Sequence, residues 1–248
     1  MGMTQEDYDK NEVIEELQYK EVMRQATLSQ CIYLFVEGQS EEAAIPILLK
    51  RSGVDLEKDG IVVANYNGIS NLPHVLRLMS QTLSYDRPII VTFDNDLAGK
   101  GVGSKIAQYL NSESKIALQT IPSSPVVSFN NGHLGGSFEE AFDPQHFVDT
   151  CFQDCFMSPN IAQMKLQFIS SFDNKKPWLD QVDGFCRQNG QLKSSVHKIT
   201  LALELAKTCP TTPSSFTDLA NLVKRTRLKY PVKHPEDVEL PKIPGLTR

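Results

Sequence analysis

Three acidic side chains stand at the ends of short apolar runs. Glu37 follows the run YLFV, and Asp94 and Asp96 follow the run IIVTF. If these runs are neighbouring parallel strands, their carboxyl ends meet at one edge of a sheet, where open α/β sheets bind ligands. Carboxylates gathered there repel one another unless a cation or protons neutralise them. Because oxygen ligands of this kind suit Mg²⁺ or Mn²⁺, the pattern predicts a divalent-metal site.

The segment VEGQSEE carries two more acids, Glu41 and Glu42. Glu41 comes four residues after Glu37, in the expected first turn of a helix, so it could return to the same edge as a ligand of a second metal ion. The alternative is an exposed acid that compensates the helix dipole, and we interpret Glu42 as a surface acid. Any single strand-end acid could equally be a helix N-cap or a turn residue. It is the combination of Glu37, Asp94 and Asp96, in this order along the chain, that favours a metal-binding role.

The acids lie in a stretch that alternates apolar runs with amphipathic segments. CIYLFV, IVVAN, IIVTF and KIALQTI have strand character, and the segments 40–53, 69–84 and 101–112 between them have a helical rhythm. Continuous apolar runs are typical of parallel strands buried on both faces. We therefore predict an α/β fold with a mostly parallel four-stranded sheet flanked by helices. The glycines of LAGKGVGSK lack the Walker spacing and indicate a flexible connection and a helix start.

Outside this stretch the sequence indicates mainly helices. Residues 5–29 form an expected N-terminal helix whose Val13, Leu17, Val22 and Met23 would pack on the main domain or on a partner. A loop over 122–136 precedes short helical segments broken by Pro144. A helix plus a polar turn is expected over 158–176, and further helices over about 193–208 and 212–230. The predicted divisions are an N-terminal helix (1–30), a catalytic core (31–145), a helical extension (146–230) and a Pro-rich tail (231–248).

Composition limits the possible partners. The 248 residues carry a net charge of −5, which counts against a strong autonomous grip on nucleic acid but suits a carboxylate-rich metal site. No apolar run is long enough to span a bilayer, and the acidic N-terminus is no signal peptide. The five cysteines, an odd number, predict free thiols and a cytoplasmic location. Cys151 and Cys155 could form half of a zinc site, but no completing pair is evident.

The order VEGQSEE, NYNGISNL, FDND resembles the TOPRIM domain. That domain is shared by topoisomerases, bacterial primases, recombination factors and nucleases of the overcoming-lysogenization-defect (OLD) family. The resemblance covers about residues 31–121. The family's Glu after the first strand corresponds to Glu37, and its Asp-x-Asp after the third corresponds to Asp94 and Asp96. VEGxxEE followed by AAIPILL is similar to the OLD type of nuclease.

The resemblance implies a Rossmann-like core with a C-terminal helical extension, and two further site residues. The FEE of SFEEAF is similar to a later metal-binding acid of OLD-type domains, which points to Glu139. HKITLALELAK resembles a late helix whose Lys is implicated in catalysis, which points to Lys198, with Lys193 and Lys207 as alternatives. His133 could act as a base, although a lone loop histidine is usually a surface residue.

The implied reaction is phosphodiester hydrolysis with two Mg²⁺ or Mn²⁺ ions, one activating water and one stabilising the leaving oxygen. In this hypothesis Glu37, Asp94 and Asp96 hold metal, and Glu41 and Glu139 complete the second site. Lys198 would stabilise charge on the phosphate. The basic run KRTRLK at 224–229 could follow a nucleic-acid backbone or be a solvated helix face.

OLD proteins normally carry an ATPase domain before the TOPRIM part, and this chain has only about thirty residues there. The resemblance therefore implies either a free-standing nuclease or an anti-phage effector nuclease controlled by a separate, ABC/SMC-like ATPase, with a homo-oligomer possible. Two alternatives stay open. One is an RNA-processing or transfer-RNA-cleaving TOPRIM ribonuclease. The other is a non-catalytic TOPRIM scaffold module.

Overall fold

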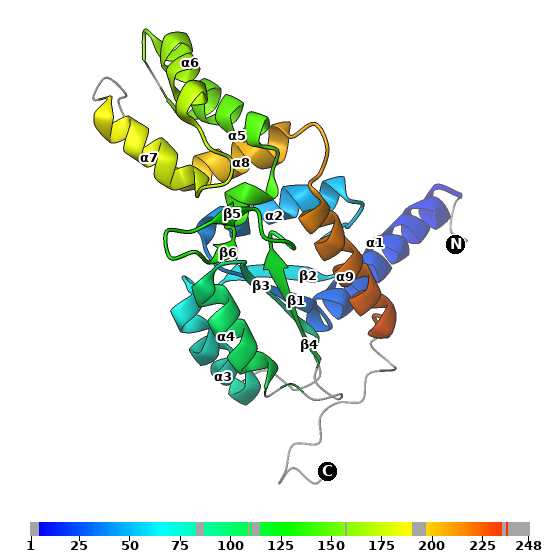
Figure 1. Cartoon of the computed structure of the whole chain (residues 1–248). Coiled ribbons are helices and arrows are strands. Elements are labelled where there is room, and N and C mark those ends of the chain that lie inside the picture. The colour runs from blue at the N-terminus through cyan, green and yellow to red at the C-terminus, as the bar shows by residue number, and fades with distance from the viewer. Residues whose placement is uncertain are drawn as a thin grey trace.

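A four-stranded parallel sheet organises the chain, in the order β2-β1-β3-β4 (Figure 1). Its strands are β1 (Ile32–Val36), β2 (Ile61–Asn65), β3 (Ile89–Asp94) and β4 (Ile116–Ile121). The predicted α/β fold is thus confirmed. This computed structural model describes residues 5–82, 87–108, 110, 115–156, 158–189, 197–234 and 237.

The two central strands are buried on both faces, as their continuous apolar runs predict. Leu34 and Val36 of β1 belong to a large hydrophobic cluster on one face, and Phe35 belongs with Val91 and Phe93 of β3 to a smaller cluster on the other. All five side chains are at most 7% exposed. Because successive side chains of a strand point to opposite faces, a strand that feeds two clusters needs apolar residues at every position.

Helices cover both faces of the sheet (Figure 1). On the side of the smaller cluster lie α3 (Leu72–Thr82), which follows the short helix η1 (Ile69–Asn71), and α4 (Leu97–Ala107). On the side of the large cluster lie α2 (Gln39–Arg51), α8 (Lys198–Thr208) and α9 (Ser214–Lys229). Helices α2 and α8, far apart in sequence, therefore pack directly against each other.

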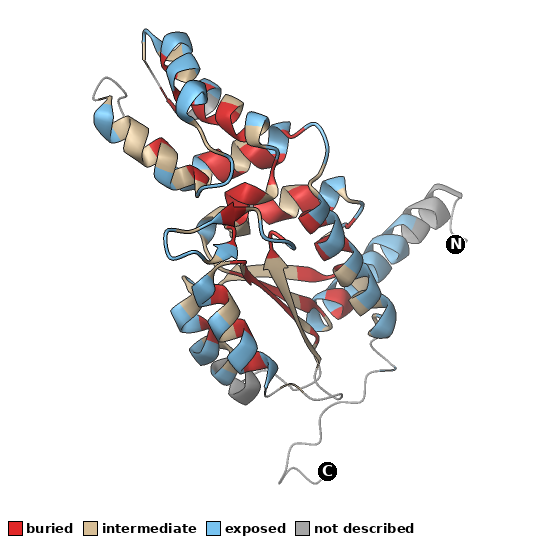
Figure 2. Ribbon diagram, viewed as in Figure 1, coloured by how far each residue is buried: buried red, intermediate tan, exposed pale blue. Residues whose placement is uncertain are grey.

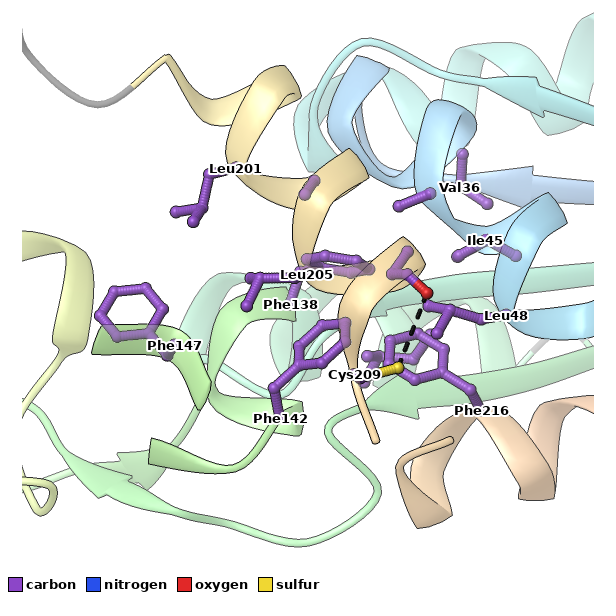
Figure 3. Close-up of a cluster of buried hydrophobic side chains, with 14 of the residues drawn as sticks. Val36, Ile45, Leu48, Phe138, Phe142, Phe147, Leu201, Leu205, Cys209 and Phe216 are labelled. Carbon is purple, nitrogen blue, oxygen red and sulfur yellow. Dashed lines mark hydrogen bonds between the residues drawn. The ribbon is translucent and has the colours of Figure 1, made fainter. Parts of the chain in front are cut away.

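The large cluster joins the sheet to the C-terminal helices (Figure 3). Ile45 and Leu48 of α2 pack there with Leu205 of α8 and with Phe138 and Phe216. The rings of Phe138 and Phe216 meet edge to face with centroids 5.4 Å apart, a favoured aromatic geometry. One apolar core thus crosses residue 145, where we predicted a boundary between the catalytic core and a helical extension; the predicted divisions of the chain stay a prediction.

The same core continues into a smaller helical layer, which carries buried residues on its inner side (Figure 2). It contains η2 (Phe138–Ala141), α5 (Pro144–Thr150), the π-helical turn η3 (Cys151–Cys155), α6 (Ile161–Ser171) and α7 (Trp178–Gln188). Fully buried Trp178 lies 5.1 Å from the Phe147 ring and 6.0 Å from the Phe172 ring, measured between centroids. Aromatic packing therefore holds this layer together.

Three local expectations need correction. Helix α4 begins at Leu97, directly after Asp96, so the glycine run is helical and not a flexible connection. The loop expected over 122–136 contains a small antiparallel hairpin, β5 (Val127–Ser128) and β6 (Leu134–Gly135). Helix α7 had no sequence prediction. In addition, the helix expected from about residue 193 is described only from Lys198, since 190–196 lie outside the described residues.

Helix α1 (Gln5–Ser29) forms as predicted but touches the main domain only near its end. Ala26 and Thr27 are buried, whereas Val13, Leu17 and Val22 are 55%, 60% and 47% exposed. The expected packing of its apolar residues on the main domain is therefore wrong for most of the helix, and packing on a partner stays a prediction. Among the residues described, no helix is long and apolar enough to cross a bilayer.

The basic run at 224–229 is tied largely to the fold. The Arg227 guanidinium donates to the carbonyls of Gln30, Asp59, Gly60 and Tyr230, at 2.8 to 3.2 Å. The Lys224 ammonium, in turn, donates to the Ser52 carbonyl. These contacts fasten α9 to the turns before β1 and β2, which favours a structural role over the hypothesis that the run follows a nucleic-acid backbone.

Candidate functional site

Glu37 and Asp94 meet at the carboxyl end of the sheet. Glu37 directly follows β1, Asp94 is the last residue of β3, and these parallel strands are neighbours. The backbone N–H of Asp94 donates to Glu37 Oε2 at 3.3 Å. The structure thus brings together the two acids that the sequence placed on separate strand ends.

Asp96 follows Asp94 by two residues and is the N-cap of α4. Its Oδ1 accepts from the Gly99 N–H at 2.6 Å, the bond by which an aspartate caps a helix. A Cβ on Gly99 would lie 2.1 Å from the Asp94 carbonyl oxygen. Glycine at this position therefore lets the first turn of α4 lie directly on the residue that ends β3, and so fixes Asp94 and Asp96 relative to each other.

Glu41 folds back over the start of α2 towards the same edge. Its Oε2 accepts from the Gly38 N–H at 3.0 Å, as the second half of a capping box. Glu42 instead accepts from the side-chain amide of Asn65, at the end of β2, and is half-buried. Our interpretation of Glu42 as a plain surface acid is therefore wrong.

Glu139 and Glu140, adjacent on η2, are both buried, at 4% and 3% exposure. Glu140 is fully engaged, because its carboxylate accepts from the backbone N–H of Ser137 at 2.7 Å and that of Trp178 at 2.8 Å. The Ser137 hydroxyl lies 2.5 Å from Glu140 and 3.2 Å from Glu139. Glu140 thus builds the turn that presents Glu139. Our sequence reasoning missed Ser137, although its Ser-x-x-Glu spacing is a capping-box signal.

Lys198 supplies a positive charge beside these acids. It is the first residue of α8, whose Leu201 and Leu205 are fully buried in the large cluster. Its charge lowers the pKa of both Glu41 and Glu139, against the stronger effect of burial. Of the alternatives, Lys207 is paired with Glu204 in the last turn of the helix, and Lys193 lies outside the described residues.

Burial and mutual repulsion disfavour the charged forms of the acids. Burial, followed by the charges of Glu37, Glu41, Glu139 and Asp96, raises the pKa of Asp94 well above its ordinary value. Burial likewise raises the pKa of Glu37 and of Glu41. The pKa of Glu139 rises to about 7, first from burial and then from neighbouring Glu140. The charges of these acids influence one another, and their ionised forms gain from protons or a cation.

Tyr66 forms a wall of this acidic cluster (Glu37, Glu41, Asp94, Asp96 and Glu139) and was not predicted. Its side chain is 2% exposed, and its hydroxyl donates to the Thr92 carbonyl at 2.8 Å. Burial raises the Tyr66 pKa, and the charges of Glu37, Asp94, Glu41 and Asp96 raise it further. These four carboxylates thus lie around one neutral hydroxyl.

The donor set fits a hard divalent cation. Five carboxylates face one another without a compensating ion pair among the described residues, apart from the nearby charge of Lys198. The side-chain oxygens of Asn65 and Asn95, at the ends of β2 and β3, are buried with no donor in the described part of the chain. However, no described group of three His, Cys, Asp or Glu side chains forms a ready-made metal cage. A cation would have to draw the mutually repelling acids together.

The predicted zinc half-site gains no support. Cys151 is fully buried among apolar side chains, and the side chain of Cys155 lies outside the described residues. The cysteines whose state is described, Cys31, Cys151, Cys186 and Cys209, are free thiols, as expected.

Comparison with known proteins agrees with this fold. The model of the overcoming-lysogenization-defect protein-like TOPRIM domain matches residues 30–96. The C-terminal region of the Burkholderia pseudomallei OLD protein superposes with a TM-score of 0.50 at 14% identity, covering 78% of this chain and 97% of that one. That of the Xanthomonas campestris pv. campestris OLD protein gives 0.48 at 15% identity, covering 80% and 97%. No curated protein matches the chain.

The fold is an α/β domain with a parallel sheet and acids at its carboxyl edge. Over residues 30–96 the sequence is similar to an OLD-like TOPRIM domain, and the fold resembles that of an OLD protein's C-terminal region. Glu37, Asp94 and Asp96 belong to or border the matched segment, whereas Glu139 and Lys198 lie beyond it. Their grouping with the other acids rests on the fold of this chain itself.

Proposed function

We propose that this chain is a metal-dependent nuclease that hydrolyses phosphodiester bonds of nucleic acid. The observation that carries the proposal is the gathering of five carboxylates and Lys198 at one sheet edge, from segments between residues 37 and 198. Buried acids that repel one another destabilise the metal-free protein at neutral pH. Such destabilising groups are typical of sites that bind a ligand. The OLD-like TOPRIM match supports the same chemistry.

Each acid has a proposed place. Glu37, Asp94 and Asp96 would hold one Mg²⁺ or Mn²⁺, and Glu41 and Glu139 would complete a second site. Bound ions of this kind polarise a phosphoryl oxygen and lower the pKa of water. The N–H groups of Asp94 and Gly38 orient Glu37 and Glu41 before any ligand arrives.

Lys198 has a different task. It lies close enough to Glu41 and Glu139 to lower the pKa of both, yet it is exposed and its ammonium forms no hydrogen bond among the described residues. We assign it to the phosphate of the substrate, where a cation stabilises charge that develops in the transition state. A methionine at this position would keep the alkyl stem and lose that charge.

We propose further that the nuclease is an effector of anti-phage defence in the cytoplasm, controlled by a separate ABC/SMC-like ATPase. Helix α1 supports a docking role, because Val13, Ile14 and Leu17 expose apolar surface away from the main domain. A pull-down from native cells that recovers no ATPase would contradict this part, and would leave the nuclease chemistry unaffected.

The decisive experiment incubates the purified chain and Mn²⁺ with plasmid, linear DNA, total RNA and transfer RNA. We expect cleavage of at least one substrate, abolished by EDTA and reduced at least about a hundredfold in Asp94→Ala. Glu57→Ala, which removes an exposed acid far from the site, is the matched control and keeps full activity. The substrate cut separates a deoxyribonuclease from a ribonuclease. No cleavage under any metal would instead favour a scaffold module.

A further inference from the structure

The β5–β6 hairpin is built onto the backbone of the metal-site turn. The Gly136 N–H donates to the Asn95 carbonyl at 3.1 Å, and Asn95 stands between Asp94 and Asp96. A Cβ on Gly135 would lie 2.0 Å from that same carbonyl oxygen. Since only glycine permits this approach, the hairpin and the two aspartates form one rigid unit.

A lysine and a histidine face each other where this hairpin meets α4. Lys100 is one turn after Asp96, and its backbone N–H donates to the Asp96 carbonyl at 3.1 Å. Its ammonium lies 3.4 Å from His133 Nε2 and donates to the Leu134 carbonyl at 2.9 Å. An ammonium has three donors, so these two contacts leave one for a ligand.

No described carboxylate forms an ion pair with Lys100 or His133. A lysine that only balanced the charge of the nearby acidic cluster would be expected to form an ion pair with one of its five acids. Lys100 forms none with a described carboxylate, so charge balance does not explain its position. An ammonium without a paired acid gains by binding an anion. The His133 ring, when its Nε2 accepts from that ammonium at 3.4 Å, carries its proton on Nδ1 and so offers a further donor.

The hairpin holds His133 in place before any ligand binds. The Phe129 N–H donates to the His133 carbonyl at 2.9 Å, and Gly132, at φ +78°, closes the turn by donating to the Phe129 carbonyl at 2.8 Å. The rings of Phe129 and His133 stack with centroids 6.3 Å apart. Phe129 is itself packed against the large cluster. His133 is therefore positioned from the hydrophobic core outward.

We propose that Lys100 and His133 bind a backbone phosphate of the nucleic-acid strand next to the bond that the metal site cuts. The inference rests on the proposed nuclease function and deepens it, because it assigns a binding site for a second phosphate of the same strand. Asp96 links the two sites: it caps α4 at the metal side, and Lys100 follows it one turn along that helix. A strand fixed at two phosphates presents the intervening bond to the acids in one register.

The test measures binding of short fluorescent single strands of DNA and of RNA by anisotropy, over a series of KCl concentrations with Ca²⁺ present. Gels check that the strands stay intact. Lys100→Met and His133→Asn are compared with Lys105→Met, which removes an exposed lysine later on the same helix. We expect Lys100→Met to weaken binding about tenfold and to lower the salt slope by about 0.7, the value for one phosphate contact with a single strand.

The outcomes separate this inference from a structural role and from the nuclease proposal. Weaker binding with a smaller salt slope in Lys100→Met, weaker binding in His133→Asn, and an unchanged Lys105→Met would support it; the DNA and RNA arms show which strand is preferred. A lower melting temperature with unchanged affinity and slope would overturn it, since the pair would then only pin the hairpin. Failure of the parent chain to bind either strand would overturn it too.

If the parent chain cuts with Mn²⁺ and Lys100→Met cuts and binds equally well, the inference fails while the nuclease proposal stands. If binding depends on Lys100 but nothing is ever cut, the nuclease fails instead.

Discussion

Adjacent glutamates on η2 illustrate how little residue type alone determines a role. Glu140 accepts from the backbone N–H groups of Ser137 and Trp178, whereas Glu139 accepts from the Ser137 hydroxyl and its own backbone N–H. Glu140 thus holds two other segments in place, whereas Glu139 is a buried acid whose pKa is raised by burial and by neighbouring Glu140. The difference follows from the turn that begins at Ser137.

Glu140→Ala should therefore destabilise the protein by about 2–3 kcal/mol, because the N–H groups of Ser137 and Trp178 lose their acceptor. Glu139→Gln should leave the metal-free stability at pH 8 unchanged or higher, since it removes a repelled charge. Chemical denaturation in EDTA measures both free energies of unfolding. Equal losses in the two variants would contradict the division of roles.

The pH dependence of the metal-free protein should follow the raised pKa of Glu139. Its folded pKa of about 7 exceeds the ordinary 4.5, so the folded state binds the proton more tightly. This contribution to stability is complete below pH 4.5 and is lost as the pH rises through about 7. Asp94, whose pKa is also raised, acts in the same direction.

We therefore expect the melting temperature in EDTA to fall between pH 5 and pH 8, and Mn²⁺ to restore it at pH 8 by replacing the missing protons. Glu139→Gln should flatten the dependence. Differential scanning fluorimetry over this range, with and without Mn²⁺, checks the prediction. A melting temperature that rises with pH in EDTA, or that ignores Mn²⁺ at pH 8, would count against a cation site here.

The sequence could indicate Glu37, Asp94 and Asp96 because strand ends are visible in the hydrophobic pattern. It could not show that Asp94 donates its N–H to Glu37, since that contact depends on β1 and β3 being neighbours. Tyr66 could not be predicted for a similar reason: it is buried in the smaller hydrophobic cluster, close enough to the acids for their charges to raise its pKa, and no local pattern reveals this.

At the scale of elements, the prediction succeeded where periodicity is strong. β1 to β4 and α2 have continuous apolar runs or a regular amphipathic rhythm, and all were placed. The β5–β6 hairpin was missed because each strand has only two residues, and its place depends on the contact between Gly136 and Asn95. Helix α7 received no prediction, because Trp178 and Val182 are its only fully buried described residues and give a short apolar pattern.

Among the contacts between elements, we expect those of Arg227 to contribute most to the free energy of unfolding. Arg227 connects α9 to the turn before β1 and to the turn before β2 through the carbonyls of Gln30, Asp59 and Gly60, and it also donates to the carbonyl of Tyr230 at the end of α9. Arg227→Ala should cost about 2–4 kcal/mol of stability, because these partly buried acceptors lose a charged donor. Arg225→Ala, at an exposed neighbour, should change stability by less than about 0.5 kcal/mol. Urea denaturation of both variants tests the contrast, and similar losses would contradict it.

At the scale of the whole molecule, α1 is an arm joined to the body by its last turn. Only Ala26 and Thr27 of its described side chains are buried. Deleting residues 1–20 should therefore shift the melting temperature by less than about 2 °C and leave Mn²⁺ binding intact, since the side chains described at 13–20 are all exposed. The same deletion should abolish binding of the proposed ATPase. A large drop in melting temperature would show that the arm stabilises the body.

The packing of α8 on α2 has a consequence for synthesis. The acids at residues 37 to 139 lie in the first part of the chain, but the lysine that stands beside them belongs to a helix near its end. A ribosome-bound chain can thus contain the acids while it still lacks Lys198 and the apolar surface of α8 against which α2 packs. If the chain is the nuclease proposed above and Lys198 has the proposed role, such a chain would be inactive, and cleavage would begin only once synthesis is nearly complete.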